Sequence, residues 1–234
     1  MTSEISAWER VTVFKDIDFE KAMEFLETSY QRDCSRAVGL KLKEKIEMYP
    51  WRYSTKARID HVIRVRKNAQ ILMDILKGKG VTVKEDRVIM AAILHDITKA
   101  ADGDLHNVTG AKIACKYLME SGFSQKEAQE VGEIIYSHSL KGEMKLSFNI
   151  EQRVLQDADL MEKGGLNGIL RSVMYTGSQR LNMHDALLRV KELDLVESEE
   201  LIEKANLDIT KSIMEEKRRR VLEFVANLEE ELNI

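Results

Sequence analysis

A histidine and an aspartate, His95 and Asp96, lie near the C-terminal end of the most apolar stretch of the chain, residues 88–97. The stretch is apolar on every side of a helix rather than on one face, so it predicts a buried central helix. A buried imidazole and a buried carboxylate each cost free energy unless they are paired, hydrogen-bonded or bound to a metal. A metal site is therefore the first chemistry that this sequence suggests.

The other four histidines each have a structural explanation when they are taken singly. His61 lies early in an amphipathic stretch, as a boundary residue would. His106 stands where a loop changes to a helix, and His138 continues an apolar helical face as a core histidine would. His184 and Asp185 repeat the His-Asp dipeptide without apolar surroundings, and we interpret them as structural. The dipeptide alone is thus a weak indicator of chemistry.

Two aspartates, Asp157 and Asp159, occur in a further mostly apolar stretch between residues 150 and 173. Carboxylates near the apolar positions of a helix are hard to explain as solvated surface. Each lies near one edge of the apolar face, so helical geometry leaves both as candidate ligands.

The elements that must position these residues are predicted to be helices throughout. The chain has one proline, and its apolar residues recur at three- to four-residue spacing. Thr82 with Glu85, and Ser124 with Glu127, have the spacing of a capping box at a helix start. The expected helices cover residues 18–31, 33–48, 55–78, 83–99, 105–121, 125–139, 150–174, 181–193 and 198–232.

Composition limits the functional classes. The 234 residues are 44% hydrophobic and 32% charged, as in a soluble globular protein, and the net charge of −4 gives no general attraction to nucleic acid. No stretch approaches the roughly 18 apolar residues that span a bilayer, and the first residues lack a signal-peptide pattern. We expect a cytoplasmic protein without nucleic-acid or membrane partners, whose sequence allows a homo-oligomer. Cys34 and Cys115 lack CxxC spacing and are expected to be reduced.

Taken in order, the candidate residues resemble the motifs of the HD superfamily of metal-dependent phosphohydrolases. The resemblance covers about residues 55 to 175. The matching stretches are Ile59-Asp-His61-Val-Ile-Arg-Val, Ala91-Ala-Ile-Leu-His95-Asp96-Ile-Thr-Lys99, Leu105-His106-Asn-Val-Thr-Gly-Ala, Ile134-Ile-Tyr-Ser-His138-Ser and Val154-Leu-Gln-Asp-Ala-Asp159-Leu-Met-Glu162. It implies one all-α HD domain with a helical N-terminal extension (1–50), a metal-binding core (51–180) and C-terminal helices (181–234).

Carried onto this sequence, the resemblance implies a mononuclear metal site formed by His61, His95, Asp96 and Asp159. The family's last aspartate usually follows an alanine and precedes an acidic residue three positions later. Asp159 fits that pattern, and Asp157 is the fallback ligand. Mixed histidine and aspartate ligation suits Mn²⁺, Fe²⁺, Co²⁺, Ni²⁺ or Zn²⁺.

HD proteins with two metals carry extra histidines between the HD pair and the last aspartate, and His106 and His138 occur there. Nucleotide pyrophosphohydrolase-like HD proteins match the region around Asp159 better, but usually lack a histidine equivalent to His138. Two alternatives therefore stay open, with one or two divalent ions per chain. Either His106 and His138 bind a second metal, or they contact substrate phosphate or ordered water.

The implied reaction is cleavage of a phosphoester or phosphoanhydride of a small phosphorylated metabolite, with a nucleotide as the expected substrate. Metal-activated water would be the nucleophile. Asp96 would bridge two metals or orient the water, and Lys99 would hold a phosphate as a point charge. Some HD nucleotidases have, in place of this lysine, an acidic residue that assists the water. Asp102 and Asp104 are the alternatives for that role in this sequence.

Three other basic residues, Arg58, Arg64 and Lys112, are candidates for further phosphate contacts, although ordinary surface charges are the simpler interpretation. Two other functional classes remain. Some HD proteins with two irons are oxygenases, and a non-catalytic protein could keep the metal site for regulation or binding.

Overall fold

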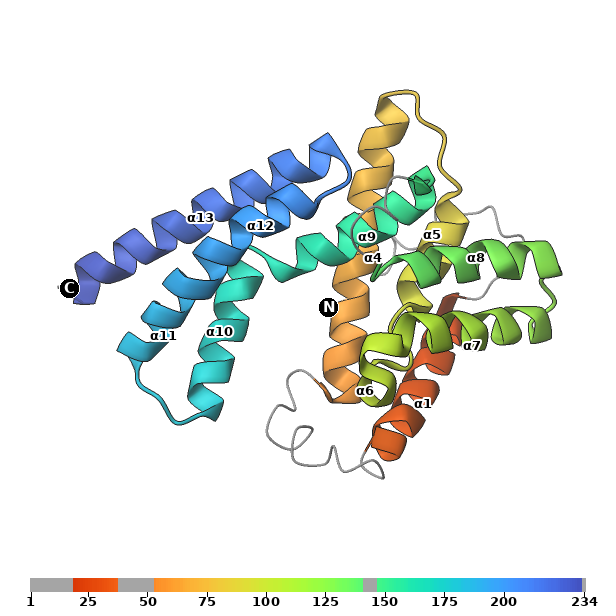
Figure 1. The fold of residues 1–234 in the computed structure, drawn as a ribbon, viewed down its shortest axis with the longest axis horizontal. Coiled ribbons are helices and arrows are strands. Elements are labelled where there is room, and N and C mark those ends of the chain that lie inside the picture. Colours follow the sequence, from red (N-terminus) through yellow and green to blue (C-terminus); the bar gives the residue numbers. More distant parts are fainter. Residues whose placement is uncertain (1–18, 38–52, 141–146, 233–234) are drawn as a thin grey trace, which may run out of the picture.

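The computed structural model describes residues 19–37, 53–140 and 147–232, and all regular structure in these ranges is helical (Figure 1). The predicted all-α fold is therefore confirmed. No helix in the described ranges is long and apolar enough to cross a membrane. The first 18 residues and the segments 38–52 and 141–146 lie outside the description, and with them most of the expected N-terminal extension.

The helices, in chain order, are α1 (Phe19–Ala37), α4 (Thr55–Gly78), α5 (Glu85–Leu94), α6 (Lys99–Asp102), α7 (His106–Glu120), α8 (Gln125–Ser137), α9 (Ile150–Lys163), α10 (Leu166–Ser178), α11 (Met183–Arg189), α12 (Val196–Lys204) and α13 (Asp208–Leu232). A 3₁₀ turn, Gly103–Leu105, joins α6 to α7, and a π-helical segment, Val190–Leu195, joins α11 to α12.

Helix α5 is the centre of the main core, as its apolar sequence predicts. All seven residues from Val88 to Leu94 are buried. The helix packs against α4, α8, α9 and α1, and Figure 1 shows it enclosed among these helices. The residues that follow α5, beginning with His95, therefore lie in the interior of the bundle.

Helices α10 to α13 form a second packing unit. Their own buried cluster consists of Ile169, Leu187, Val190, Val221 and Val225. In Figure 1 these helices extend away from α4, α5 and α8, and α9 leads into them. The C-terminal part of the chain thus has an apolar core separate from the one that surrounds α5.

One of the two predicted capping boxes is present. Ser124 and Glu127 make both reciprocal hydrogen bonds at the start of α8. The other prediction is wrong, because α5 begins at Glu85 and its N-cap is Lys84. The side chain of Glu151 at the start of α9 accepts a hydrogen bond from the Lys84 backbone N–H at 3.0 Å. A contact from a distant helix therefore replaces the local one.

Several predicted helices are interrupted. The expected helix 150–174 breaks at Gly164 and Gly165, where Gly165 has φ 73° and a Cβ would lie 3.0 Å from the Lys217 side chain on α13. The expected helix 83–99 ends at Leu94, and the expected helix 198–232 is broken at residues 205–207. In contrast, α1 continues through residue 32, where a break was predicted. At Gly165 the close approach of α13 accounts for the break.

Candidate metal centre

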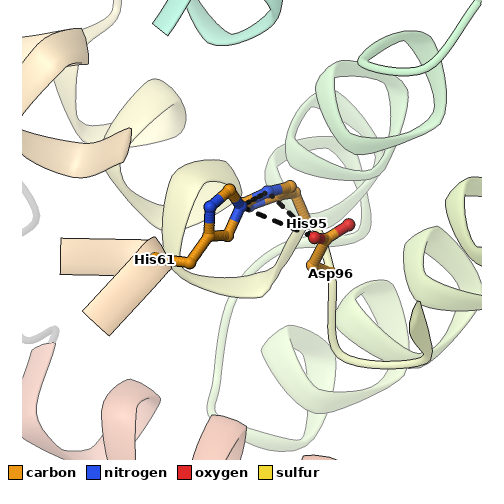
Figure 2. A group of neighbouring side chains, drawn as sticks. All are labelled: His61, His95 and Asp96. Atoms are coloured by element: carbon orange, nitrogen blue, oxygen red, sulfur yellow. Dashed lines mark hydrogen bonds and ion pairs between the residues drawn. The ribbon is translucent and has the colours of Figure 1, made fainter. Parts of the chain in front are cut away.

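Five helices bring the predicted ligands to one place. His61 lies on α4, and His95 and Asp96 directly follow α5. Helix α7 begins at His106, His138 directly follows α8, and Asp159 lies on α9. Figure 2 shows His61 pointing from α4 toward His95 and Asp96. The structure therefore assembles all six residues from helices that are far apart in sequence.

The first half of the site, the α4 side, contains His61, His95, Asp96 and Asp159. The Nε2 atoms of His61 and His95 are 3.2 Å apart. Oδ2 of Asp96 lies 3.6 Å from the Nε2 atom of each histidine. Oδ1 of Asp159 lies 3.4 Å from Nε2 of His61. Two imidazoles and two carboxylates thus converge around one point.

The second half, the α7 side, contains His106, His138 and the other oxygen of Asp96. The Nε2 atoms of the two histidines are 2.9 Å apart. Oδ1 of Asp96 lies 3.2 Å from Nε2 of His106 and 3.5 Å from Nε2 of His138. Asp96 therefore lies between the two halves and presents one carboxylate oxygen to each, as a bridging ligand does.

The tautomers of the histidines explain what these clusters need. Nδ1 of His95, His106 and His138 lies 2.9, 2.5 and 2.6 Å from the backbone carbonyl oxygen three residues earlier. A carbonyl oxygen only accepts, which in a neutral ring favours the tautomer with the proton on Nδ1 and the lone pair on Nε2. Nδ1 of His61 faces a carboxylate oxygen of Glu162 at 3.4 Å, which favours the same tautomer.

Each half of the site therefore brings two Nε2 atoms and a carboxylate oxygen close together. A bound cation would stabilise such a group of acceptor atoms. The candidate ligand atoms of His61, His95 and Asp96 lie within 4.8 Å of one another, as do those of Asp96, His106 and His138. This donor set fits divalent transition metals. Asp159 would complete the α4 side.

Burial and a buried arginine control the charges at the centre. His95 is fully buried, and burial lowers its pKa to about 3, so its ring is neutral at neutral pH. Burial acts to raise the pKa of Asp96, but the Arg58 guanidinium opposes it, and the pKa lies well below its usual range. The Arg58 guanidinium is bonded to Asp96 Oδ2, and its Cζ lies 5.1 Å from the centre of the Tyr30 ring.

The interpretation of Arg58 as a surface charge is wrong. Its residue exposure is 7%. A signal in the sequence was available, because Arg58 precedes Val62 by four residues and Val65 by seven, on the face of α4 that is buried. An arginine on an apolar helical face requires a buried anion, and Asp96 supplies it.

On the opposite side, α9 and α4 carry further charged groups, of which Lys163 was not a candidate in the sequence. Lys163 lies 2.8 Å from Asp159 Oδ2. Burial acts to raise the pKa of Asp159, but Lys163 and His61 outweigh it and lower the pKa. Glu162 is 4% exposed and accepts a hydrogen bond from Arg64 Nε at 2.9 Å. The spacing of Asp159 and Lys163, four residues on one helix, was the signal for this pair.

Lys99 contacts the α7 side. Its Nζ lies 3.2 Å from both ring nitrogens of His106. Burial lowers the pKa of its ammonium group. Lys99 thus lies beside the α7 side of the site, and its phosphate contact, which the resemblance implies, stays a prediction.

The other candidates lie elsewhere. Asp157 accepts hydrogen bonds from the backbone N–H groups of Asn206 and Leu207, at 2.9 Å each, just before α13 begins. Asp102 pairs with Arg36 of α1 at 2.8 Å.

Three further residues, Asp104, Lys112 and His184, are exposed. The structural interpretation of the second His-Asp dipeptide is consistent with the capping box that Asp185 forms with Asn182.

The comparison with protein families agrees with this geometry. Residues 58–164 match the model of the HD domain, and this range contains all six converging residues. The six residues therefore lie within the part of the chain, a little under half of it, that matches the HD domain.

Two kinds of curated relative match the chain over stretches of different length. The bifunctional uridylyltransferase/uridylyl-removing enzyme of Vibrio atlanticus is 35% identical over 78 residues, which are 33% of this chain but only 8% of that enzyme. The Bacillus subtilis protein YpgQ is 25% identical over 175 residues, covering 68% of this chain and 80% of YpgQ. The chain therefore spans a small part of the first relative and most of the second.

Solved structures share the fold. Bacillus subtilis YpgQ in complex with ADP has a TM-score of 0.54 and 24% identity, over 74% of this chain and 88% of YpgQ. An HD-superfamily hydrolase from Bacillus thuringiensis has a TM-score of 0.58 and 22% identity, over 91% and 98% of the two chains. A predicted HD superfamily hydrolase from an uncultured Thermotogales bacterium has a TM-score of 0.56 and 21% identity, over 92% and 99%. These neighbours show that the chain shares their fold.

Proposed function

We propose that this chain is a metal-dependent phosphohydrolase that cleaves a phosphoester or phosphoanhydride of a small phosphorylated metabolite, with a nucleotide as the substrate. The observation that carries the proposal is the division of the Asp96 carboxylate, with one oxygen facing His61 and His95 and the other facing His106 and His138. The proposed ligands are His61, His95, Asp96 and Asp159 on one side, and Asp96, His106 and His138 on the other.

A divalent cation bound there would supply two effects, activation of a water molecule and withdrawal of charge from the phosphoryl oxygens. The chain's own residues provide the rest. Arg58 fixes the orientation of Asp96 through a buried guanidinium contact. Lys99 lies over His106, where its ammonium would bind a phosphate oxygen as a point charge.

The nucleotide part of the proposal is supported by the relative YpgQ, whose structure was solved in complex with ADP. The net charge of −4 gives no general attraction to nucleic acid, so we propose a small ligand and not a polynucleotide. We place the protein in the cytoplasm.

The test begins with elemental analysis of protein purified without chelator. A metal-to-protein ratio of about one or about two would distinguish the two ligand sets. Metal-dependent release of phosphate or pyrophosphate in an anaerobic nucleotide screen would support hydrolysis. Consumption of O₂ without phosphate release would instead indicate the oxygenase alternative, and metal binding without turnover would indicate a regulatory protein.

The matched variants are Asp96→Asn and Asp60→Asn. Asp96 bridges the two halves of the site, whereas Asp60 is an exposed acid on α4 beside His61. We expect Asp96→Asn to lower kcat/KM by a factor of about 100 or more, by the usual loss for removing a metal ligand or its close partner. The kcat/KM of Asp60→Asn should stay within about twofold of the wild-type value. Equal activities in the two variants would refute the assignment.

A further inference from the structure

Helix α1 reaches the candidate site through a buried carboxylate. Asp33 is 5% exposed, and its Oδ2 accepts hydrogen bonds from the backbone N–H of Ala100 at 2.9 Å and of Ala101 at 3.0 Å. These two residues directly follow Lys99 at the start of α6. A residue more than 60 positions earlier in the chain therefore binds the segment that carries the lysine.

The contact does what a helix cap usually does locally. The first N–H groups of a helix have no partner within the helix, and a side chain just before it normally accepts from them. In α6 the N-cap residue, Thr98, makes no such bond. Its hydroxyl instead bonds to the backbone carbonyl of His106 at 3.1 Å. Asp33 takes over the capping function from another helix.

The other end of α6 is held by the same helix. Arg36, one turn after Asp33 on α1, contacts Asp33 Oδ1 at 2.7 Å and Asp102 Oδ1 at 2.8 Å. Asp102 is the last residue of α6. Both ends of this four-residue helix are thus fixed to α1, and its place relative to α7 is set by α1 as well as by the chain on either side.

We infer that Asp33 is a positioning residue for Lys99, and that through it α1 sets the phosphate affinity of the site. The pathway is short. Asp33 holds the N–H groups next to Lys99, and the Lys99 ammonium lies 3.2 Å from the ring nitrogens of His106. This inference rests on the proposed function, which gives Lys99 its role toward phosphate.

The first measurement is independent of activity. Hydrogen exchange of the Ala100 and Ala101 amides is compared in Asp33→Ala, Asp33→Asn and Glu27→Ala. Glu27 is an exposed acid on the same helix, so its variant removes an equal charge from α1 without touching α6. We expect exchange at both amides to be about tenfold or more faster in Asp33→Ala, unchanged in Glu27→Ala and intermediate in Asp33→Asn, which keeps one acceptor oxygen. Unchanged exchange in Asp33→Ala overturns the inference.

The second measurement tests whether the effect passes through Lys99. Binding of inorganic phosphate to the Mn²⁺-loaded protein is measured by calorimetry for Asp33→Ala, Lys99→Ala and the double variant. We expect each single variant to weaken phosphate binding about tenfold, and the double variant to be no weaker than Lys99→Ala within about twofold. Multiplication of the two effects would mean that Asp33 acts independently of Lys99, and would overturn the inference.

The two proposals can fail separately. If no nucleotide is hydrolysed but phosphate binding shows the non-additive pattern, the proposed function fails and the positioning role of Asp33 stands. If Asp33→Ala does not fold, Asp33→Asn takes its place in both measurements, with Glu27→Gln as its control. In that case slower or unchanged amide exchange in Asp33→Asn, or additive effects with Lys99→Ala, contradicts the positioning role.

Discussion

Metal binding should stabilise this protein, and Asp96→Asn should abolish most of that stabilisation. In the metal-free state two pairs of Nε2 lone pairs face each other and the carboxylate oxygens of Asp96. A cation that binds only the folded chain adds about 2.7 kcal/mol at a concentration 100 times its dissociation constant. For a domain of this size, each kcal/mol raises the melting temperature by about 2–4 °C. The expected rise is therefore about 5–11 °C per occupied site.

Asp96→Asn isolates this effect because it keeps the shape of the side chain. The amide oxygen would still accept from Arg58, while the amide nitrogen would face His106 and His138 and donate to one of their lone pairs. Without metal, Asp96→Asn should lower the free energy of unfolding by about 1–3 kcal/mol, because Arg58 keeps a hydrogen bond but loses a charged partner. The decisive quantity is thus the increase in stability on adding metal, not the absolute melting temperature.

The assay is thermal unfolding followed by circular dichroism, first in EDTA and then with Mn²⁺, Co²⁺ or Zn²⁺ titrated to saturation. The control variant is Asp60→Asn, whose side chain is exposed next to His61. The unchanged protein and Asp60→Asn should show the same metal-dependent rise. If Asp96→Asn shows that rise in full, Asp96 does not bridge the two halves of the site, and the reasoning from facing lone pairs is wrong.

Three further outcomes follow from the contacts described. Burial lowers the pKa of His95 to about 3, well below its ordinary value of 6.5, so the unfolded chain takes up the proton first as the pH falls. Between about pH 6.5 and about pH 3, protonation of this histidine in the unfolded chain should lower the free energy of unfolding of the metal-free protein by about 1.4 kcal/mol for each pH unit. Urea midpoints that do not change between about pH 7 and about pH 5 would contradict this. Asp157→Ala should lower the free energy of unfolding, measured in urea, by about 2–5 kcal/mol, because two backbone N–H groups just before α13 lose their acceptor. A changed metal-to-protein ratio in this variant would instead indicate that Asp157 is a metal ligand. Gly132→Ala should lower the free energy of unfolding by about 1–3 kcal/mol, because a Cβ there would overlap the sulfur of Cys115. Gly177→Ala, where a Cβ meets open space, is the control. Adding Cys115→Ala to Gly132→Ala should restore most of the lost stability.

The parts of the fold that were predicted correctly are those with a strong local sequence pattern, such as a long apolar stretch or a capping box. The apolar stretch before His95 predicted a buried helix, and α5 is buried along residues 88–94. Helix α4 has the predicted bounds, and the capping box of Ser124 is present. In these places a residue's partners lie within one or two helical turns, so the chain's own periodicity determines the outcome.

The wrong predictions occur where a distant segment replaces a local interaction. Glu151 accepts from the N-cap residue of α5, and a Cβ at Gly164 would lie 2.8 Å from the Met214 side chain. Arg58 was interpreted as a surface charge because its partner, Asp96, is 38 residues away in the sequence. Sequence spacing carries no information on which helices become neighbours.

The sequence by itself determined the chemistry available to this protein. Four histidines and two aspartates stand in the order of the HD motifs, and the apolar patterns around His95, His138 and Asp159 indicated that these three are at least partly buried. Only the tertiary structure decided how these side chains face one another. It divided the oxygens of Asp96 between two pairs of histidines, directed Asp159 toward His61 and Asp157 toward α13, and brought Asp33 of α1 to the segment of Lys99. The physical reason is that residue types and periodicity define which groups must leave water, whereas their partners are fixed only when separate helices pack against each other.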